Sequence, residues 1–453
     1  MNEQELLAVD KKYVWHPYTQ MKDYENRSPI LIDRAKGVKL YDASGKFYYD
    51  IISSWWCNIL GHNRPEINKA IAKQLHHFEH TLFAGFTNKP AIQLAEKLIS
   101  ITHPNLQKVF YADNGSTANE AALKMSFQYW KNNGIKGKES FIYLENGYHG
   151  DTIGAMSVSG VSQFNNVFKP LFFKAHQIPS PYCYRCPFSK QPDSCNFECL
   201  APLETLLKAK ANEISAIILE PLMQGAGGII IYPPEYLNRL YAIVKKYDIH
   251  IILDEVATGF GRTGKMFAYE HTRLVPDFLC VSKALTNGTL PLSAVITTNA
   301  VYNAFYDDYD KNKTFFHGHT YTGNPISCSA AVATLNVVKK SKLIEKSKDK
   351  IEYLNKLVKP LERMEHIGEV RQLGFIVAFE IVLDKEKKTR FPAEKRVGWN
   401  LYLEGLKNNL ILRPLGDVVY LYLPLTVTKK ELNDIIARLT KTLRILQGSD
   451  AKQ

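Results

Sequence analysis

The sequence predicts an α/β fold in which a largely parallel sheet is covered by helices on both faces, with a smaller α+β domain attached. Between about residues 70 and 300, short runs of β-branched and other apolar residues alternate with helical stretches. Nearly continuous apolar strands separated by helices are typical of parallel sheets, because neither face of such a sheet meets water. The 453 residues, 45% of them hydrophobic, suffice for two or three domains with large cores.

Six strands of this sheet can be located from their apolar runs. They are expected at 108–113, 141–146, 216–221, 250–255, 277–283 and 292–298. The helix before the fourth strand is the clearest one, since it starts with Pro233 and Pro234 and repeats apolar side chains at helical spacing on one face. That face carries Leu237, Leu240, Tyr241 and Val244.

After about residue 335 the sequence changes to amphipathic helices followed by shorter strands. Strands are expected within 374–383 and 418–425, and a final helix is expected over 429–446. Together with the N-terminal segment, this region would form a small α+β domain. We therefore predict a large domain over residues 61–335 and a small domain built from residues 1–60 and 336–453.

The net charge of +12, from 57 Lys and Arg against 45 Asp and Glu, first suggests a nucleic-acid or membrane partner. The distribution of the charges argues against both. Basic residues are densest at 339–356, where acidic residues interleave with them as on a solvated helix face. No stretch approaches 18 uninterrupted apolar residues. We expect neither nucleic acid nor membrane among the partners.

The N-terminus and the cysteines together predict a cytoplasmic protein. Glu3, Glu5 and Asp10 lie where a secretory or mitochondrial targeting segment would carry basic residues. The seven cysteines are an odd number in a chain too large to need disulfides for its stability.

Four of the cysteines form a CxxC pair followed by a CxxxC pair, at Cys183, Cys186, Cys195 and Cys199. Four thiolates suit Zn²⁺, but the second spacing departs from that of common zinc sites. The alternatives are a zinc knuckle or a surface loop whose thiols stay reduced or pair opportunistically, and we favour the loop. We expect no catalytic metal. A basic zinc-knuckle protein that binds nucleic acid is the disfavoured alternative from another functional class.

Polar residues follow the predicted strands at the edge where ligands bind in open α/β sheets. Gly115, Ser116 and Thr117 follow the strand at 108–113 and open a helix, where free N–H groups and the helix dipole favour a phosphate. The simpler alternative for these residues is an ordinary N-cap. Tyr148 lies between glycines after the next strand, where its ring could approach a ligand closely.

Two ionisable residues are expected at strand ends, where burial would give them unusual chemistry. Asp254 follows four apolar strand residues, so its carboxylate needs a cation or a donor opposite it. Lys283 would close the strand at 277–283, where desolvation lowers the pKa of an amine and lets it attack carbonyls. A solvated side chain is the usual alternative for a single lysine. Together with a phosphate cradle and an aromatic ring, these residues match the needs of pyridoxal 5′-phosphate.

The stretches around these residues resemble the class III, fold-type I aminotransferases that use pyridoxal 5′-phosphate. The match is strongest over LDEVATGFGRTGKMFAYEH and PDFLCVSKALTNGTLPLSAVITT, and it extends from about Trp15 to Pro424. It implies a mostly parallel seven-stranded sheet, and a homodimer with active sites at the subunit interface. Within the class, the motifs WHPYT, SWW, GYHGD and LRPLG are similar to those of the branch that converts 8-amino-7-oxononanoate to 7,8-diaminononanoate in biotin biosynthesis.

The resemblance also implies a role for each residue of the site. Lys283 would bond to the cofactor and transfer the proton as the catalytic residue, and Asp254 would pair with the pyridine nitrogen. Arg413 would hold the carboxylate of the acceptor in its bidentate fork. The other cofactor-binding residues would be Gly115, Ser116, Thr117, Tyr148, Val256 and Thr320, the last of them reaching the neighbouring subunit. The other substrate-binding residues would be Tyr18, Trp55, Trp56, Tyr148, Asp151 and Gly318.

The resemblance leaves the donor and the acceptor with alternatives. S-adenosylmethionine is the expected amino donor, and lysine is the alternative, because Gly318-His319-Thr320 stands where users of S-adenosylmethionine in this branch usually have Gly-Pro-Thr. The alternative function is that of another class III ω-amino acid aminotransferase, one that acts on a substrate such as 4-aminobutyrate or ornithine.

Overall fold

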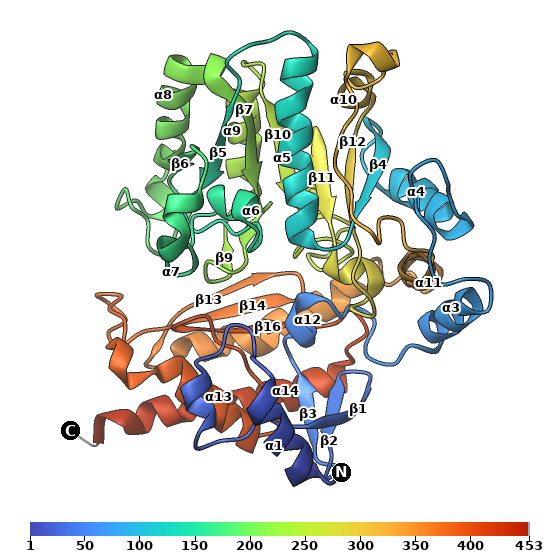
Figure 1. Cartoon of the computed structure of the whole chain (residues 1–453). Helices are drawn as coiled ribbons and strands as arrows, with labels where there is room; N and C mark the ends of the chain where they lie inside the picture. The colour runs from blue at the N-terminus through green and yellow to red at the C-terminus, as the bar shows by residue number, and fades with distance from the viewer. Residues whose placement is uncertain (452–453) are drawn as a thin grey trace.

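A seven-stranded sheet forms the centre of the larger part of the molecule (Figure 1). In the computed structural model, which describes residues 1–451, its strand order is β4-β12-β11-β10-β7-β5-β6. The strands are β4 (Leu106–Ala112), β5 (Ser140–Leu144), β6 (His176–Ile178), β7 (Ile214–Leu219), β10 (His250–Asp254), β11 (Phe278–Val281) and β12 (Ser293–Thr298). β12 runs in the direction opposite to the other six strands, which all run the same way, so the predicted mostly parallel sheet is confirmed.

Helices cover both faces of this sheet, as the apolar strands require (Figure 1). Alternate residues of one strand enter different cores: Ile252 packs with Ala118 and Ala121 of α5, while Ile251 and Leu253 join the core on the opposite face. The helices around the sheet are α3 (Pro65–Leu75), α4 (Lys89–Ile101), α5 (Gly115–Asn132), α6 (Ile153–Ser157), α7 (Ser162–Asn165), α8 (Ala201–Lys210), α9 (Pro234–Val244), α10 (Asn299–Asn303) and α11 (Pro325–Lys340).

The helix predicted to start with the two prolines is α9, and its apolar face is buried as expected. Leu237, Leu240 and Val244 are buried, while Tyr241 is half-buried against the core. Of the seven strands only β6 was not predicted, because three residues are too few to show a pattern of apolar side chains.

The smaller part combines both ends of the chain, which lie together below the large sheet in Figure 1. One sheet has the order β1-β2-β3-β15, and in it β3 pairs in parallel with β15 from the C-terminal region. A second, antiparallel sheet has the order β13-β14-β16. The strands are β1 (Ile32–Lys36), β2 (Lys39–Asp42), β3 (Phe47–Asp50), β13 (Ile367–Leu373), β14 (Ile376–Ile381), β15 (Leu410–Ile411) and β16 (Val418–Tyr422), with helices α1 (Glu3–Tyr13), α12 (Ser347–Val358), α13 (Val397–Lys407) and α14 (Lys429–Leu443).

The predicted domain boundaries at residues 60 and 335 stay a prediction. The pairing of β3 with β15 is consistent with a small domain built from both termini. Helix α11 runs without interruption across residue 335, so the connection between the two parts on that side is helical. No helix of the described chain is both long and apolar enough to cross a membrane.

The carboxyl ends of β4, β5, β7, β10 and β11 meet at the edge of the large sheet that faces the smaller part (Figure 1). Asp254 is the last residue of β10, as predicted. The prediction that Lys283 ends its strand is wrong, because β11 stops at Val281. The next strand, β12, runs antiparallel, so the chain must turn back here, and Lys283 begins the 3₁₀ helix η7 (Lys283–Thr286) with a left-handed φ of 45°.

Candidate active site

A cavity of about 670 Å³ lies at this edge of the sheet, and most of the predicted site residues line it. A pocket of this size is ample for a cofactor and part of a substrate. Its walls include the predicted residues Trp56, Gly115, Ser116, Tyr148, Asp151, Asp254, Val256 and Lys283. Tyr18, Trp55, Thr117, Gly318, Thr320 and Arg413 are not part of this lining.

The carboxylate of Asp254 is held in a fixed orientation at the cavity wall. Its Oδ1 accepts a hydrogen bond of 3.0 Å from the Val256 N–H. Its Oδ2 accepts one of 2.8 Å from the Asn119 amide and lies 2.8 Å from His149 Nδ1. The side chain is almost fully buried, and three polar partners offset the cost of burying it. Neither Asn119 nor His149 was predicted as a site residue.

The amine of Lys283 lies in the same cavity in surroundings that favour its neutral form. Burial lowers the pKa of the amine from its usual value, although the charges of Asp254 and Glu220 oppose the shift. The nitrogen is 5.1 Å from the centroid of the Trp56 ring. A neutral amine is a nucleophile and a proton acceptor, which an ammonium ion is not.

The N-terminus of α5 forms the end of the cavity suited to a phosphate. The N–H groups of Gly115 and Ser116 open the helix, where they have no intrahelical partner, and the helix dipole favours an anion. Gly115 is required here, because a methyl group on it would lie 2.6 Å from a Val256 carbon. The hydroxyl of Thr117 belongs to the capping box with Asn114 and is therefore already hydrogen-bonded.

Glu220 is a second buried carboxyl in the cavity, and the sequence analysis did not select it. Glu220 directly follows β7, just as Asp254 is the last residue of β10. A carboxyl at the end of an apolar strand was therefore the sequence feature that could have identified Glu220. Its oxygens accept hydrogen bonds from the N–H groups of Tyr148 (2.9 Å) and Gly225 (2.8 Å). Burial, and secondarily the nearby Asp254, raise the pKa of the Glu220 carboxyl to about 8.

Two tyrosines and an aspartate meet at the cavity, where Tyr148 and Asp151 line the wall and Tyr18 lies outside the lining. The hydroxyl of Tyr18 lies 2.7 Å from each carboxylate oxygen of Asp151 and 3.4 Å from the hydroxyl of Tyr148. Burial raises the pKa of Tyr18 to about 12, so this phenol is a donor at neutral pH. The arrangement joins the N-terminal segment to the loop after β5.

Trp55 and Arg413 lie next to Tyr18, outside the cavity lining. The Arg413 guanidinium is 4.3 Å from the centroid of the Trp55 ring, a cation–π distance. The Trp55 and Tyr18 rings meet edge to face with centroids 5.7 Å apart. A cation and two aromatic rings in contact with one another can bind an acid with an apolar chain.

The segment that contains Gly318 and Thr320 is exposed and makes no wall of the cavity. His80 Nε2 lies 2.7 Å from the Thr320 carbonyl oxygen. The predicted reach of Thr320 into a neighbouring subunit stays a prediction.

The four cysteines between 183 and 199 are free, as are the other three. Burial raises the pKa of Cys199 to about 12. Within residues 1–451, no group of three or more His, Cys, Asp or Glu side chains is arranged to hold a metal ion. The loop is instead fastened to the smaller part through Glu380 of β14. That carboxylate accepts hydrogen bonds from the Tyr182 hydroxyl (2.7 Å) and from Arg185 and Arg371 (3.0 Å each).

Comparison with known proteins agrees with the fold. Residues 20–443 match the family described as aminotransferase class-III. The chain therefore belongs to the class III aminotransferases, and its fold is that of the fold-type I enzymes. It is 43% identical to the adenosylmethionine-8-amino-7-oxononanoate aminotransferase of Geobacter sulfurreducens over 98% of both chains. The protein of the same name from Aquifex aeolicus is 44% identical over 97% of both chains. The crystal structure of the Methanocaldococcus jannaschii protein of that name has a TM-score of 0.92 at 41% identity, covering 98% of this chain and 99% of that one.

Proposed function

We propose that this aminotransferase transfers an amino group to 8-amino-7-oxononanoate, giving 7,8-diaminononanoate in biotin biosynthesis, with pyridoxal 5′-phosphate as its cofactor. The observation that carries the proposal is the meeting of Asp254 and Lys283 in one cavity, beside the Tyr18–Asp151 pair and Arg413. The names of relatives that share 43 and 44% of the sequence over nearly the whole chain support the same reaction.

The residues of the cavity fit each part of the cofactor. The start of α5, where Gly115 leaves the N–H groups accessible, suits the phosphate. Asp254, held by three partners, suits the protonated ring nitrogen, and Lys283 suits the aldehyde carbon. When bound, pyridoxal 5′-phosphate supplies an aldehyde that takes up an amino group and a ring that withdraws electrons from the adjacent carbon.

The protein's own groups supply the proton transfer. The Lys283 amine, with its lowered pKa, can accept a proton from the reacting carbon and return it on the other side of the transfer. Asp254 keeps one orientation through its hydrogen bonds, so the charge at the far end of the ring stays in place during both half-reactions. Tyr148 lies in the cavity wall, where its backbone N–H donates to Glu220 and its ring meets Phe164 edge to face with centroids 6.1 Å apart.

The acceptor is recognised by its two charged ends. The amino group beside the ketone would lie against Asp151 and the hydroxyls of Tyr18 and Tyr148, because a carboxylate is there to bind a cation. The distant carboxylate would reach Arg413, and the apolar chain would pass along Trp55.

We propose S-adenosylmethionine as the amino donor and lysine as the alternative. The relatives named above carry adenosylmethionine in their names, which favours the first. The Gly318-His319-Thr320 sequence keeps lysine as the second candidate.

We also propose a homodimer in which Thr320 of one subunit completes the phosphate site of the other. Two observations support this. Thr320 is exposed and lies outside the cavity of its own chain, and large aromatic side chains on either side of it are exposed as well, Phe316 by 77% and Tyr321 by 61%.

The function is tested by an acceptor panel with the purified enzyme and S-adenosylmethionine or lysine as donor. Product formation is followed by mass spectrometry with 8-amino-7-oxononanoate, succinic semialdehyde and glutamate semialdehyde as acceptors. We expect turnover with the first acceptor alone, and its loss by more than about 10⁴-fold in Lys283→Ala, since no other group replaces the catalytic amine. Faster turnover with either semialdehyde would assign the chain to a 4-aminobutyrate or ornithine type of enzyme.

A further inference from the structure

A left-handed helical turn carries the two tryptophans of the site. Ser53, Ser54, Trp55 and Trp56 have φ values of 50°, 44°, 70° and 73°. The Trp56 N–H donates to the Ile52 carbonyl (2.9 Å), as in an α-helix, but the hand of the turn is opposite. L side chains avoid this conformation, and four such residues in a row persist only where the surroundings hold them.

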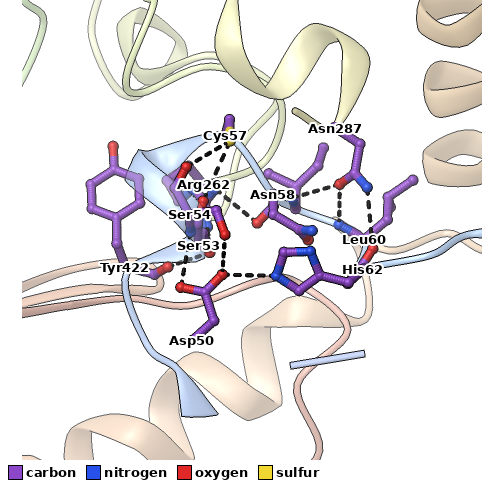
Figure 2. A network of polar contacts seen from close by, with 12 residues as sticks. Asp50, Ser53, Ser54, Cys57, Asn58, Leu60, His62, Arg262, Asn287 and Tyr422 are labelled. Carbon is purple, nitrogen blue, oxygen red and sulfur yellow. Dashed lines mark hydrogen bonds and ion pairs between the residues drawn. The ribbon is translucent and has the colours of Figure 1, made fainter. Parts of the chain in front are cut away.

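Asp50, the last residue of β3, holds the middle of this turn (Figure 2). Its Oδ1 accepts a hydrogen bond of 2.9 Å from the Ser54 N–H, and its Oδ2 accepts one of 2.7 Å from the Ser54 hydroxyl. His62 Nε2 lies 2.8 Å from the same Oδ2 and fixes the carboxylate from the other side. Asp50 is 3% exposed, so its carboxylate is shielded from water, while Ser54 itself is exposed.

Arg262 holds the end of the turn. Its guanidinium is fully buried and donates to the carbonyl oxygens of Trp56 and Asn58, at 3.2 Å each, and to the Ser53 hydroxyl at 3.4 Å. The turn therefore has one support that acts on the backbone and hydroxyl of its second residue, Ser54, and another that acts on its last carbonyl. Figure 2 labels both supporting residues, Asp50 and Arg262, around Ser53 and Ser54.

The orientation of both tryptophans depends on this one turn. The Trp56 ring stacks on Tyr422, with centroids 5.4 Å apart and planes 20° apart, and lies beside Lys283. The Trp55 ring lies between Tyr18 and Arg413. Any other backbone conformation at Ser54 would turn one or both rings away from these contacts.

We propose that Asp50, oriented by His62, is a positioning residue that locks the left-handed turn and thereby sets Trp55 and Trp56 for the acceptor. Asp50 is not part of the cavity lining, so it acts through the turn and not on the reacting atoms. The inference rests on the proposed function, because the importance of the two rings follows from the acceptor that passes them.

The test is a rescue experiment with the holoenzyme. In Asp50→Asn, an amide replaces one of the two acceptor oxygens that hold Ser54. Ser54→Gly is the complementary change, because glycine adopts a left-handed φ without steric cost. We expect Asp50→Asn to raise the KM for 8-amino-7-oxononanoate about tenfold with kcat changed less than about threefold. We expect Ser54→Gly alone to stay near wild type, and the double variant to recover most of the lost affinity.

A second readout separates positioning from a loss of stability. Near-ultraviolet circular dichroism reports the packing of the Trp56–Tyr422 stack, and we expect its signal to change in Asp50→Asn and to return in the double variant. Asp277→Asn is the matched control. Asp277 also accepts a backbone N–H bond, from Ile251 at 2.8 Å, but this bond lies at the amino-terminal end of β10, whereas the active site lies at its carboxyl end. It should leave both KM and the spectrum unchanged.

The proposal is wrong if Asp50→Asn leaves KM and the spectrum as in wild type, or if Ser54→Gly restores neither in the double variant. If the wild-type enzyme fails to aminate 8-amino-7-oxononanoate, the proposed function fails, while the circular dichroism of the same variants still decides whether Asp50 holds the turn.

Discussion

Glu220 gives the site a titratable carboxyl whose folded-state pKa, about 8, lies above the usual 4.5. Below pH 4.5 this group is neutral in both folded and unfolded chains and favours neither. As pH rises from about 4.5 to about 8, the unfolded chain releases the proton while the folded chain keeps it, so stability falls across this window. The loss is on the order of a few kcal/mol.

Glu220→Gln should remove this part of the pH dependence. We expect the stability of the cofactor-free variant to exceed that of wild type increasingly from pH 5 to pH 8, as measured by urea unfolding at each pH. A constant difference across this range would show that Glu220 is ionised in the folded protein.

The hydroxyl of Tyr18 is expected to contribute to acceptor binding through Asp151. Tyr18→Phe removes the donor 2.7 Å from both Asp151 oxygens, and we expect a five- to twentyfold rise in KM for the acceptor, corresponding to about 1–2 kcal/mol. Tyr309→Phe is the control, because Tyr309 is 97% exposed. Equal KM values for the two variants would contradict the role of Tyr18.

At the scale of elements, the buried ion pairs around Glu380 join the loop at 182–199 to strands β13 and β14. Glu380 is 1% exposed, and its removal would leave Arg371 buried with one carboxylate fewer. We expect Glu380→Ala to lower the free energy of unfolding by about 3–5 kcal/mol in urea titrations. Glu235→Ala, which removes one partner of the exposed Glu235–Arg239 ion pair, should lower it by less than about 1 kcal/mol. A loss below about 1 kcal/mol in Glu380→Ala would mean that the loop is fastened by other contacts.

The left-handed turn at residues 53–56 is also stabilised by contacts between several elements of the fold. Such a conformation costs roughly 1–2 kcal/mol per residue. Its cost is met by contacts from β3, from the loop that follows β10 and from the region of β16, which explains why no local sequence pattern revealed it.

At the scale of the whole molecule, the sequence predicted the large sheet because its strands are buried on both faces and so consist of apolar runs. The two-residue β15 and three-residue β6 have no such pattern, since pairing with neighbours and not their own composition defines them. Asp254 and Lys283 could be selected from strand ends, although the turn after β11 moved Lys283 out of its strand.

The partners of the site residues could not be predicted in the same way. His149 and Asp254 are 105 positions apart, and Tyr18 and Asp151 are 133 apart, so only the fold brings them together. The resemblance to class III enzymes gave Tyr18 and Arg413, but not Asn119, Glu220 or Asp50.

The proposed dimer is a prediction for the whole molecule. Light scattering should give twice the 51.6-kDa mass of the chain. Phe316→Asp, next to the Gly318–Thr320 segment, should shift the mass towards one chain and weaken retention of the cofactor, because the partner's Thr320 would be lost from the phosphate site. Leu383→Asp, at an exposed position of the C-terminal part, is the control and should remain dimeric. A wild-type monomer with full activity would contradict the dimer.

A single half-reaction tests whether 8-amino-7-oxononanoate is the amino acceptor. The enzyme is first converted to its pyridoxamine form with donor, freed of donor, and then mixed with 8-amino-7-oxononanoate alone while its absorption spectrum is recorded. We predict that the spectrum of the aldehyde form returns within one turnover and that one equivalent of 7,8-diaminononanoate is formed per active site. No return of the aldehyde spectrum with this acceptor, combined with rapid return with succinic semialdehyde, would show that the enzyme does not use 8-amino-7-oxononanoate.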